Sequence, residues 1–246
     1  MDTASLSLRP GTPDDADALA ELLTAARRAA VPMMPPPVHT AAEDRAWVGR
    51  QLAGEREVWV AEGAGALVGY LILEPGWLHS LYVRPGLKGQ GIGSFLLDFV
   101  KGLRPEGFAL WVFESNEPAR RFYRRHGLVE IRRTDGADNE ERAPDVEMAW
   151  LGEEPFGALR RRIDAVDDEL ADLLDRRAAL TAHVQRLKEV PGQAGRDPDR
   201  EAEIATRMAR RAPRLGRERV QRIMHAVITE SLDAAEKTLE ENAPES

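Results

Sequence analysis

Hydrophobic and polar positions follow two different periods in the first 150 residues. Apolar residues recur at helical spacing in segments 13–30, 41–52, 93–101 and 118–126. Strand-like apolar runs occupy 5–9, 58–62, 66–73, 77–83, 108–113, 129–133 and 146–150. Short turns with Gly and Pro separate 58–62, 66–73 and 77–83, so an antiparallel meander is expected there. The pattern predicts an α/β (α+β) fold with a mixed, mainly antiparallel sheet.

From residue 159 onward the pattern is purely helical. Apolar residues step by four and three along one seam, which is typical of helices packed as in a coiled coil. Further helices are expected from Pro198 and from about Gly216, where core spacing continues through Val220, Met224, Val227, Ser231 and Ala235. We therefore predict an all-α three-helix domain. The turn-forming residues 151–155 divide the chain into domains 1–152 and 153–246. The seam comprises Leu159, Ile163, Val166, Leu170, Leu173, Leu180, Val184 and Leu187.

Composition and charge narrow the function classes. The 246 residues carry 34 basic and 42 acidic side chains, a formal net charge of −8, which argues against a general nucleic-acid binder. The absence of cysteine excludes disulfides, thiolate nucleophiles and Cys-metal sites. No apolar run has membrane-spanning length, and the N-terminus lacks the pattern of a signal peptide. We expect a cytoplasmic protein with small-molecule substrates and no metal, membrane or nucleic-acid partner.

A glycine-rich segment suggests the first binding site. Lys88-Gly89-Gln90-Gly91-Ile92-Gly93 follows a predicted strand and leads directly into a helix. Glycines let the backbone approach a ligand, and the first N–H groups of a helix attract a pyrophosphate. The pattern alone fits an ordinary glycine turn equally well. No acidic residue has the spacing of a ribose ligand, which disfavours a dinucleotide.

Together with the segment Leu110–Gly127, LWVFESNEPARRFYRRHG, this motif resembles the GNAT superfamily of acetyl-CoA-dependent N-acetyltransferases, over residues 6–150. The resemblance implies that a glycine loop binds the CoA pyrophosphate and that a strand edge binds pantetheine. It also implies that Tyr123 protonates the departing CoA thiolate. Lys88 stands where the family usually has Arg or Gln. The implied cofactor residues are Leu81, Tyr82, Val83, Lys88, Gly89, Gln90, Gly91, Ile92, Gly93, Ser94 and Asn116.

The acceptor side is less defined by the sequence. The alternative role for Tyr123 is a core aromatic on a helix face, and the domain would then bind an acyl-CoA without transferring the acyl group. An amine must lose a proton before it reacts, so a base is needed. The candidates are His79, Glu74 and Glu114, and His79 fits a packed, hydrogen-bonded histidine equally well. His39 and Glu43 are candidate pocket residues that fit plain surface as well, and the amine itself is unknown.

Charges on apolar faces suggest a second site in the helical part. Arg177 interrupts the seam of the first helix, and Lys188 returns to nearly the same face eleven residues later. Glu201 lies on the apolar stripe of the next helix, beside Arg200. A buried charge is costly unless it is paired or bound by a ligand, so these residues predict an anionic ligand inside the bundle. The alternative is a dimerisation bundle with solvated charges.

These residues, with the segment Arg196–Glu201, RDPDRE, resemble the all-helical type of chorismate mutase over residues 155–236. The resemblance implies an intertwined homodimer that converts chorismate to prephenate by a [3,3] rearrangement without a cofactor. Arg160 and Arg177 are about 25 Å apart on one helix, so a second subunit must supply one of them if both bind one substrate. By resemblance the partner supplies Arg160. The implied catalytic residues are Arg160, Arg177, Lys188 and Glu201, and the implied substrate-binding residues are Asp197, Arg200, Ser231 and Glu236.

One position departs from the chorismate mutase pattern. The family usually has Gln or Glu one turn after the serine, as a second donor to the ether oxygen, and this chain has Ala235, with Glu236 next to it. The domain is therefore expected to be a chorismate mutase that is weakly active or pH-dependent. The alternative is a related enzyme, an isochorismate pyruvate lyase or an aminodeoxychorismate mutase. The second hypothesis is a catalytically silent module for dimerisation or for sensing chorismate or an aromatic ligand. We predict a bifunctional acetyltransferase and chorismate mutase as the first hypothesis.

Overall fold

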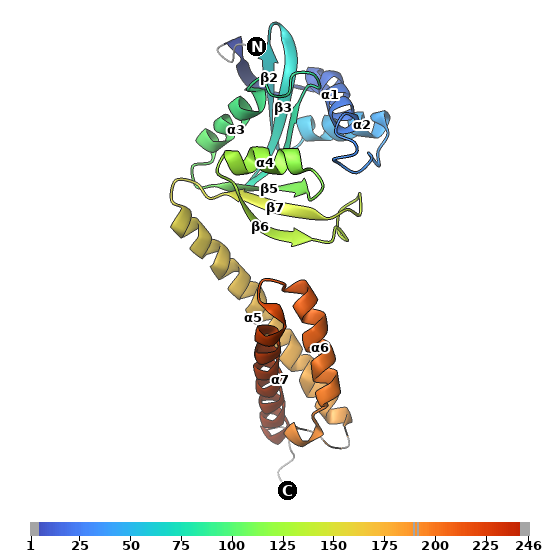
Figure 1. The fold of residues 1–246 in the computed structure, drawn as a ribbon, viewed down its shortest axis with the longest axis vertical. Helices are drawn as coiled ribbons and strands as arrows, with labels where there is room; N and C mark the ends of the chain where they lie inside the picture. The colour runs from blue at the N-terminus through green and yellow to red at the C-terminus, as the bar shows by residue number, and fades with distance from the viewer. Residues whose placement is uncertain (1–4, 189, 191, 242–246) are drawn as a thin grey trace. The chain divides into compact units, whose positions relative to one another are not determined.

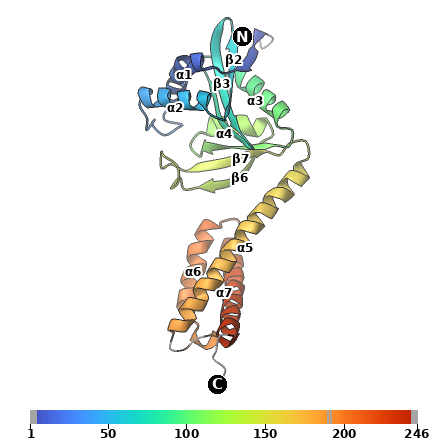
Figure 2. The same cartoon turned by 180° about the vertical axis from the view of Figure 1, so that it is seen from behind.

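The computed structural model describes residues 5–188, 190 and 192–241. The chain divides into two compact units, Met1–Arg160 and Arg161–Ser246. The boundary between the units lies inside the first helix of the all-helical segment, eight residues beyond the expected boundary at residue 152. Figures 1 and 2 show the elements of each unit from opposite sides.

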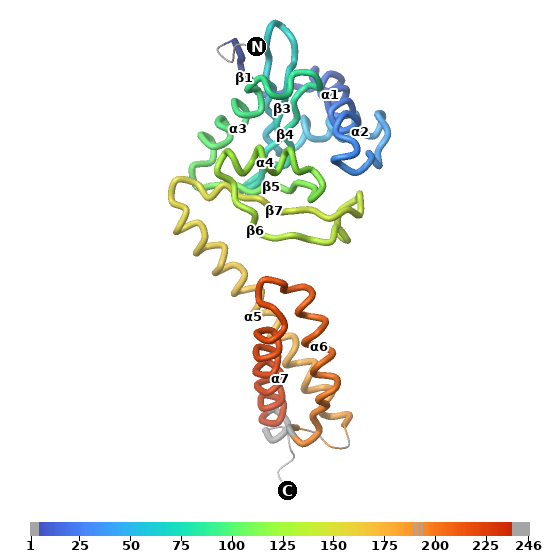
Figure 3. Tube along the Cα trace, in the orientation of Figure 1, coloured from blue at the N-terminus to red at the C-terminus, as the bar shows by residue number. Residues whose placement is uncertain are grey.

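A mixed seven-stranded sheet forms the centre of the first unit (Figure 3). Its order is β1-β2-β3-β4-β5-β7-β6, and every neighbouring pair is antiparallel except β4 and β5. The predicted meander and the mainly antiparallel sheet are confirmed. The insertion of β7 between β5 and β6 has no signal in the sequence pattern. The strands are β1 Ser7–Pro10, β2 Glu57–Gly63, β3 Ala66–Glu74, β4 Trp77–Val83, β5 Phe108–Phe113, β6 Val129–Thr134 and β7 Asp145–Trp150.

Helices cover both faces of this sheet. Alternate residues of β3 belong to different cores: Tyr70 and Ile72 pack with α1 and α2, whereas Leu71 and Leu73 pack with α3. The predicted helix 13–30 begins as a short 3-10 helix, η2, before it continues as α1. The helices are η2 Pro13–Asp15, α1 Ala16–Arg28, α2 Ala41–Ala53, α3 Ile92–Leu103 and α4 Glu117–Arg125.

The parallel strands β4 and β5 separate soon after they meet. Their only register pair in the described chain is Trp77 with Ala109, at the start of β4. Residues 81–83 therefore pair with β3 on one side and have no strand partner on the other. This free edge lies immediately before the glycine-rich segment and α3, so the fold exposes backbone polar groups at the place where the sequence predicts a cofactor.

Helix α5 spans Pro155–Leu187, and its part beyond Arg160 belongs to the second unit. The described remainder of this unit contains α6 Pro198–Arg211, α7 Gly216–Glu241 and the short 3-10 helix η3 Gln193–Gly195. Its hydrophobic cluster is formed by α6 and α7, with Val220 and Met224 buried as the spacing predicts. Ser231 and Ala235 are buried too, but Val227 is only half-buried. Ile228 and Leu232 are also buried, although the spacing did not single them out, because the buried stripe of α7 is wider than one seam.

The apolar seam of α5 does not enter this cluster. Ile163, Val166 and Leu173 are 58%, 61% and 60% exposed, and the other seam residues are at least 39% exposed. The seam of α5 is therefore exposed in a single chain, and its packing against another helix stays a prediction. No described helix is both long enough and apolar enough to cross a membrane.

The core of the first unit gives a stability prediction. Leu96 of α3 is fully buried, so Leu96→Ala should lower the free energy of unfolding by about 2–5 kcal/mol. All five tryptophans lie in this unit, so tryptophan fluorescence during urea unfolding reports on it. The control Val129→Ala, at a 41% exposed position, should change the free energy by about 0.5 kcal/mol or less. Equal effects of the two substitutions would contradict the assigned core.

Candidate active sites

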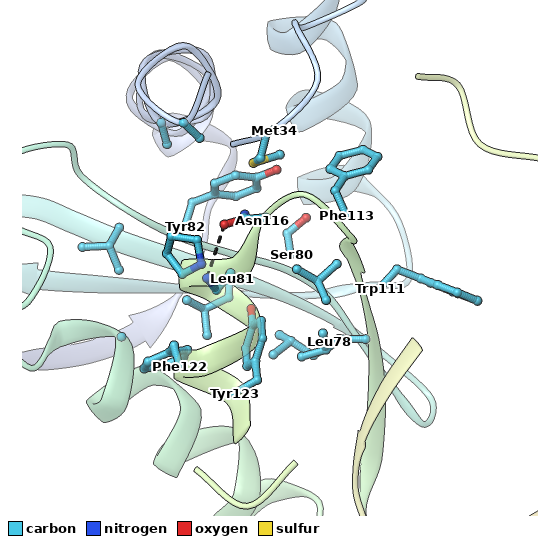
Figure 4. A pocket seen from close by; sticks show the side chains of 18 of the residues that line it. Met34, Leu78, Ser80, Leu81, Tyr82, Trp111, Phe113, Asn116, Phe122 and Tyr123 are labelled. Atoms are coloured by element: carbon cyan, nitrogen blue, oxygen red, sulfur yellow. Dashed lines mark hydrogen bonds between the residues drawn. The ribbon is translucent and has the colours of Figure 1, made fainter. Parts of the chain in front are cut away.

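A cavity of 1220 Å³ lies where β4 and β5 separate. Residues from the end of β4, the glycine-rich segment and α4 line it, and Figure 4 shows their side chains. Most of the predicted cofactor residues are among its lining residues. The lining includes Leu81, Tyr82, Val83, Lys88, Gly89, Gly91, Gly93, Ser94 and Asn116.

The start of α3 forms one end of this cavity. Gly89 and Gly91 have φ values of 81° and 85°, a left-handed conformation that favours glycine. Gly91 is the N-cap of α3, and no side chain caps the helix. The first N–H groups of α3 are therefore available to an anion, as the helix dipole favours. The side chain of Lys88 is exposed at the same place.

Two predicted cofactor residues do not line the cavity with their side chains. Gln90 donates a hydrogen bond from Nε2 to the carbonyl oxygen of Gly86, at 3.4 Å. Ile92 is fully buried in the core between the sheet and α3. The predicted contact of Gln90 and Ile92 with the cofactor uses their backbone N–H groups. The positions of their side chains neither make nor block that contact. Ser94 directs its hydroxyl to Nε2 of His126, at 3.0 Å.

Tyr123 and Asn116 reach the cavity from α4. Tyr123 lines the cavity, and its hydroxyl points into it in Figure 4. Burial raises the pKa of Tyr123, so the phenol keeps its proton at neutral pH. Asn116 is the N-cap of α4, where its Oδ1 accepts a hydrogen bond from the N–H of Ala119 at 3.3 Å. The aromatic ring of Tyr123 also packs against the core, so the core role and the cavity position hold together.

A second cavity of 540 Å³ adjoins the first, and both are lined by His79, Ser80 and Tyr82. His39 and Glu43 line the second cavity, as the sequence analysis suggested. The two other candidate bases lie elsewhere. Glu74 accepts a hydrogen bond from Arg56 at 3.0 Å, and Glu114 pairs with Arg133; neither lines either cavity.

His79 has the properties of a base at the junction of the cavities. Its Nδ1 lies 3.1 Å from Oγ of Ser80, and its ring lies 5.6 Å from that of Trp47. The His79 side chain is exposed on one side, and desolvation of the rest of the ring, with a smaller contribution from the charge of Arg56, lowers the pKa of His79. The imidazole is therefore neutral at neutral pH and can accept a proton.

Sequence reasoning missed several residues that line the cavities. Trp111 is 41% exposed in an otherwise apolar strand, and Arg132 lies over its ring at 5.1 Å. The strand sequence is apolar throughout, so the exposure of Trp111 is visible only in the structure. Trp47, Glu140 and Glu141 come from distant segments, and nothing in the local sequence relates them to β4.

In the second unit the fold joins Arg177 of α5 to Ser231 of α7. Nη1 of Arg177 donates to Oγ of Ser231 at 2.6 Å and to the carbonyl oxygen of Val227 at 3.2 Å. No carboxylate forms an ion pair with Arg177 in the described part of the chain, and burial lowers its pKa. The guanidinium is thus partly desolvated with neutral partners, which is a favourable position for an anion.

Lys188 and Glu236 lie near the short helix η3. Nζ of Lys188 donates to the carbonyl oxygen of Gly195 at 2.7 Å. The carboxylate of Glu236 lies against the backbone of Gly192. Ala235, in the position where the resemblance leads one to expect Gln or Glu, is 2% exposed and offers no donor.

The remaining predicted residues are only partly brought together. Glu201 is half-buried, but its carboxylate is bound by Arg196 at 2.7 Å through two hydrogen bonds, which lower the pKa of Glu201. Asp197 is exposed and caps α6 by accepting from the N–H of Arg200 at 3.0 Å. The Arg200 side chain is exposed and pairs with Glu203, and its role in a substrate site stays a prediction.

Arg160 stands apart from Arg177 on the same helix. Its guanidinium lies over the ring of Phe156 at 4.3 Å, and both residues belong to α5. No group of three or more His, Asp or Glu side chains in the described chain is arranged to hold a metal ion.

Comparison with known proteins supports the division into two domains. A model of the acetyltransferase (GNAT) domain matches residues 54–130. The peptidyl-lysine N-acetyltransferase YjaB of Escherichia coli strain K12 is 28% identical over 104 residues, which are 42% of this chain and 70% of YjaB.

Solved structures show the same fold for the first unit. The solution structure of apo-form YjaB from Escherichia coli has a TM-score of 0.51 at 24% identity, over 60% of this chain and 98% of YjaB. A GCN5-related N-acetyltransferase from Rhodopseudomonas palustris has a TM-score of 0.53 at 24% identity, over 60% of this chain and 96% of its own.

A model of chorismate mutase type II matches residues 159–236, which lie almost entirely in the second unit. Both domain families are enzymes, and their matched segments do not overlap. The chain therefore carries an acetyltransferase domain of the GNAT family followed by a chorismate mutase domain of type II.

Proposed function

We propose that the first unit transfers an acetyl group from acetyl-CoA to an amine. The observation that carries this proposal is the large cavity where β4 and β5 separate. The unpaired edge of β4 and the start of α3, which no side chain caps, bound this cavity. The strand edge at 81–83 suits an extended amide-containing chain, and residues 88–94 suit a pyrophosphate. Acetyl-CoA, when bound, supplies the acetyl group as a thioester.

The side chains of the cavity divide the proton transfers between them. His79 lies where the two cavities meet, and its lowered pKa leaves a ring nitrogen free to accept the proton of the amine. The phenol of Tyr123, like any tyrosine, holds its proton at neutral pH, and burial raises its pKa further. That proton is available to the sulfur atom of the leaving thiolate.

Replacing Tyr123 tests this assignment. Tyr123→Phe removes the acidic hydrogen and keeps the ring, so kcat for acetyl transfer should fall about 10²-fold. The dissociation constant for acetyl-CoA, measured by calorimetry, should remain within about twofold. Unchanged kcat would contradict the role of Tyr123 as a proton donor. If the wild-type protein binds acetyl-CoA but acetylates no amine, the domain is a binding module.

For the second unit we propose rearrangement of chorismate to prephenate. This proposal rests on Arg177, a partly desolvated cation with only neutral partners in the described chain, and on Lys188, whose described partner is a backbone carbonyl group. Arg177 would bind a carboxylate of the substrate in bidentate geometry, and Lys188 would donate to the ether oxygen as charge develops there. Holding a compact substrate conformation needs no covalent chemistry.

A homodimer would complete this site. Arg160 and Arg177 are separated by about 25 Å along α5, so one small substrate cannot touch both in one chain. The exposed seam of α5 offers a surface on which a second copy can pack. In the dimer, Arg160 of one copy would reach the substrate site of the other copy. That other copy would supply Ser231 and Glu236 from its α7.

Because Ala235 lacks a donor group, binding of chorismate without its conversion is a second candidate function of this unit. A chain without the usual donor at this position could bind chorismate and not convert it, which would make the unit a sensor of aromatic precursors. The same scaffold could serve a related lyase or aminodeoxychorismate mutase. Identification of the product from chorismate and isochorismate distinguishes these outcomes.

Substitution of Arg177 tests the proposed mutase. Arg177→Ala should lower the kcat/KM for chorismate by about 10²-fold or more. The loss of chorismate absorbance measures the rate. The control Arg207→Ala removes an exposed arginine of α6 and should leave the rate within about twofold. A wild-type protein that binds chorismate without turnover would favour the sensor. Equal rates for the two variants would contradict the assigned site.

Charge placed on the seam of α5 tests the dimer. Light scattering of the wild-type protein should give twice the chain mass of 27.3 kDa. The double substitution Leu170→Glu and Leu173→Glu should give the monomer mass, because it would bury two carboxylates in the interface. Asp168→Asn on the same helix is the control and should remain dimeric. A monomeric wild-type protein at micromolar concentration would contradict the proposed dimer.

A further inference from the structure

The second cavity is built by elements that are far apart in the sequence. Its lining comes from α1, α2, the end of β4 and the segment between β6 and β7. The residues that it shares with the first cavity are Met34, His79, Ser80, Tyr82, Phe113 and Glu141. Because His79 lies at this junction, a molecule in the second cavity would present its amine to the proposed base.

Aromatic side chains form much of its wall. Trp47, Tyr82 and Phe113 line the cavity, and the ring of Trp47 is inclined by 32° to the ring of His79 at 5.6 Å. Met34 adds a flexible apolar contact from the segment between α1 and α2. Met34, Tyr82 and Phe113, which are labelled in Figure 4, line both cavities. These surfaces suit a flat apolar body and a cation held against aromatic faces.

Negative charge exceeds positive charge around this cavity. Four carboxylates line it, against two guanidinium groups and His39, whose pKa is raised by its bond to Glu140, so carboxylates outnumber the cationic groups. Arg27 pairs with Glu141, and both side chains are largely buried. Arg50 is exposed. An ammonium group is therefore favoured inside the cavity, and an added carboxylate is disfavoured. The four carboxylates are those of Glu43, Asp44, Glu140 and Glu141.

Three interactions tie the two sides of this region together. His39 bonds Glu140 at 2.7 Å, and the hydroxyl of Ser115 donates to the carbonyl oxygen of Met33 at 2.9 Å. Arg27 with Glu141 is the third. They join α1 and the segment after it to the end of β5 and the segment between β6 and β7. An extended peptide laid across the cavity would have to break them, whereas a small molecule inside would not.

We propose that the acceptor is a small primary amine with a flat aromatic body and no carboxylate, an arylalkylamine. This inference rests on the proposed acetyl transfer and adds the substrate class. The ammonium group enters the field of the carboxylates, and the aromatic body packs between Trp47, Tyr82 and Phe113. Deprotonation by His79 then leaves the amine at the junction with the first cavity.

A panel of four acceptors tests the class on the full-length protein. 2-Phenylethylamine has the proposed chemistry, phenylalanine adds a carboxylate, putrescine lacks the aromatic body, and an N-terminally blocked lysine peptide represents an extended acceptor. Release of the CoA thiol gives kcat/KM for each. The value for 2-phenylethylamine should exceed each of the others by about tenfold or more. A higher value for phenylalanine, putrescine or the peptide would overturn the proposed class.

Two variants connect the preference to the cavity. Trp47→Leu should raise the KM for 2-phenylethylamine about tenfold, because it removes an aromatic face. Glu140→Gln should narrow the preference for 2-phenylethylamine over phenylalanine by about threefold or more, because it removes a negative charge. The matched control Glu57→Gln changes a carboxylate that pairs with Arg104 and lines neither cavity. An unchanged KM in Trp47→Leu, or an unchanged preference in Glu140→Gln, would overturn the assignment to this cavity.

Binding of acetyl-CoA distinguishes an error in the substrate class from an error in the proposed acetyl transfer. Each variant should keep the wild-type dissociation constant for acetyl-CoA, which also shows that the first unit remains folded. If acetyl-CoA binds and another class of amine is acetylated best, the arylalkylamine class is wrong and acetyl transfer stands. If acetyl-CoA does not bind and no amine is acetylated, acetyl transfer itself is wrong.

Discussion

Both proposed sites depend on polar groups that the chain leaves without a full complement of partners. Unpaired backbone and charged groups cost free energy when they are withdrawn from water, and a ligand can offset that cost. In the first unit these groups are the free edge of β4 and the start of α3. In the second unit the group is the guanidinium of Arg177, whose described partners are a hydroxyl and a carbonyl group.

The two units create these groups in different ways. In the first, β5 diverges from β4 after a single register pair, and two glycines turn the chain into α3 close to the exposed edge. In the second, α5 carries its apolar seam on an exposed face and Arg177 toward α7. A partner for that seam would exclude water near Arg177 and strengthen any interaction with an anion. The proposed dimer and the proposed substrate site would therefore be parts of one arrangement.

The sequence predicted local structure well because hydrophobic period and turn residues act over short distances. The strands, the glycine loop and the placement of Arg177 on an apolar stripe all follow from spacing alone. The insertion of β7 beside β5 is a long-range choice and leaves no local signal. For the same reason the sequence did not relate Trp47 and Glu140 to the end of β4, since the fold alone brings them to one cavity. Arg200 lies beside Glu201 in sequence, as the analysis noted, but helical spacing does not reveal that its exposed side chain pairs with Glu203.

Hydrogen–deuterium exchange of the full-length protein, read by mass spectrometry, tests the shared principle most directly. Acetyl-CoA should slow exchange in peptides that cover residues 79–95, because it would occupy the strand edge and the start of α3. Chorismate should slow exchange around residues 177–188 and 227–236. Saturating ligand that leaves exchange unchanged in these segments, or protects other segments instead, would contradict the account.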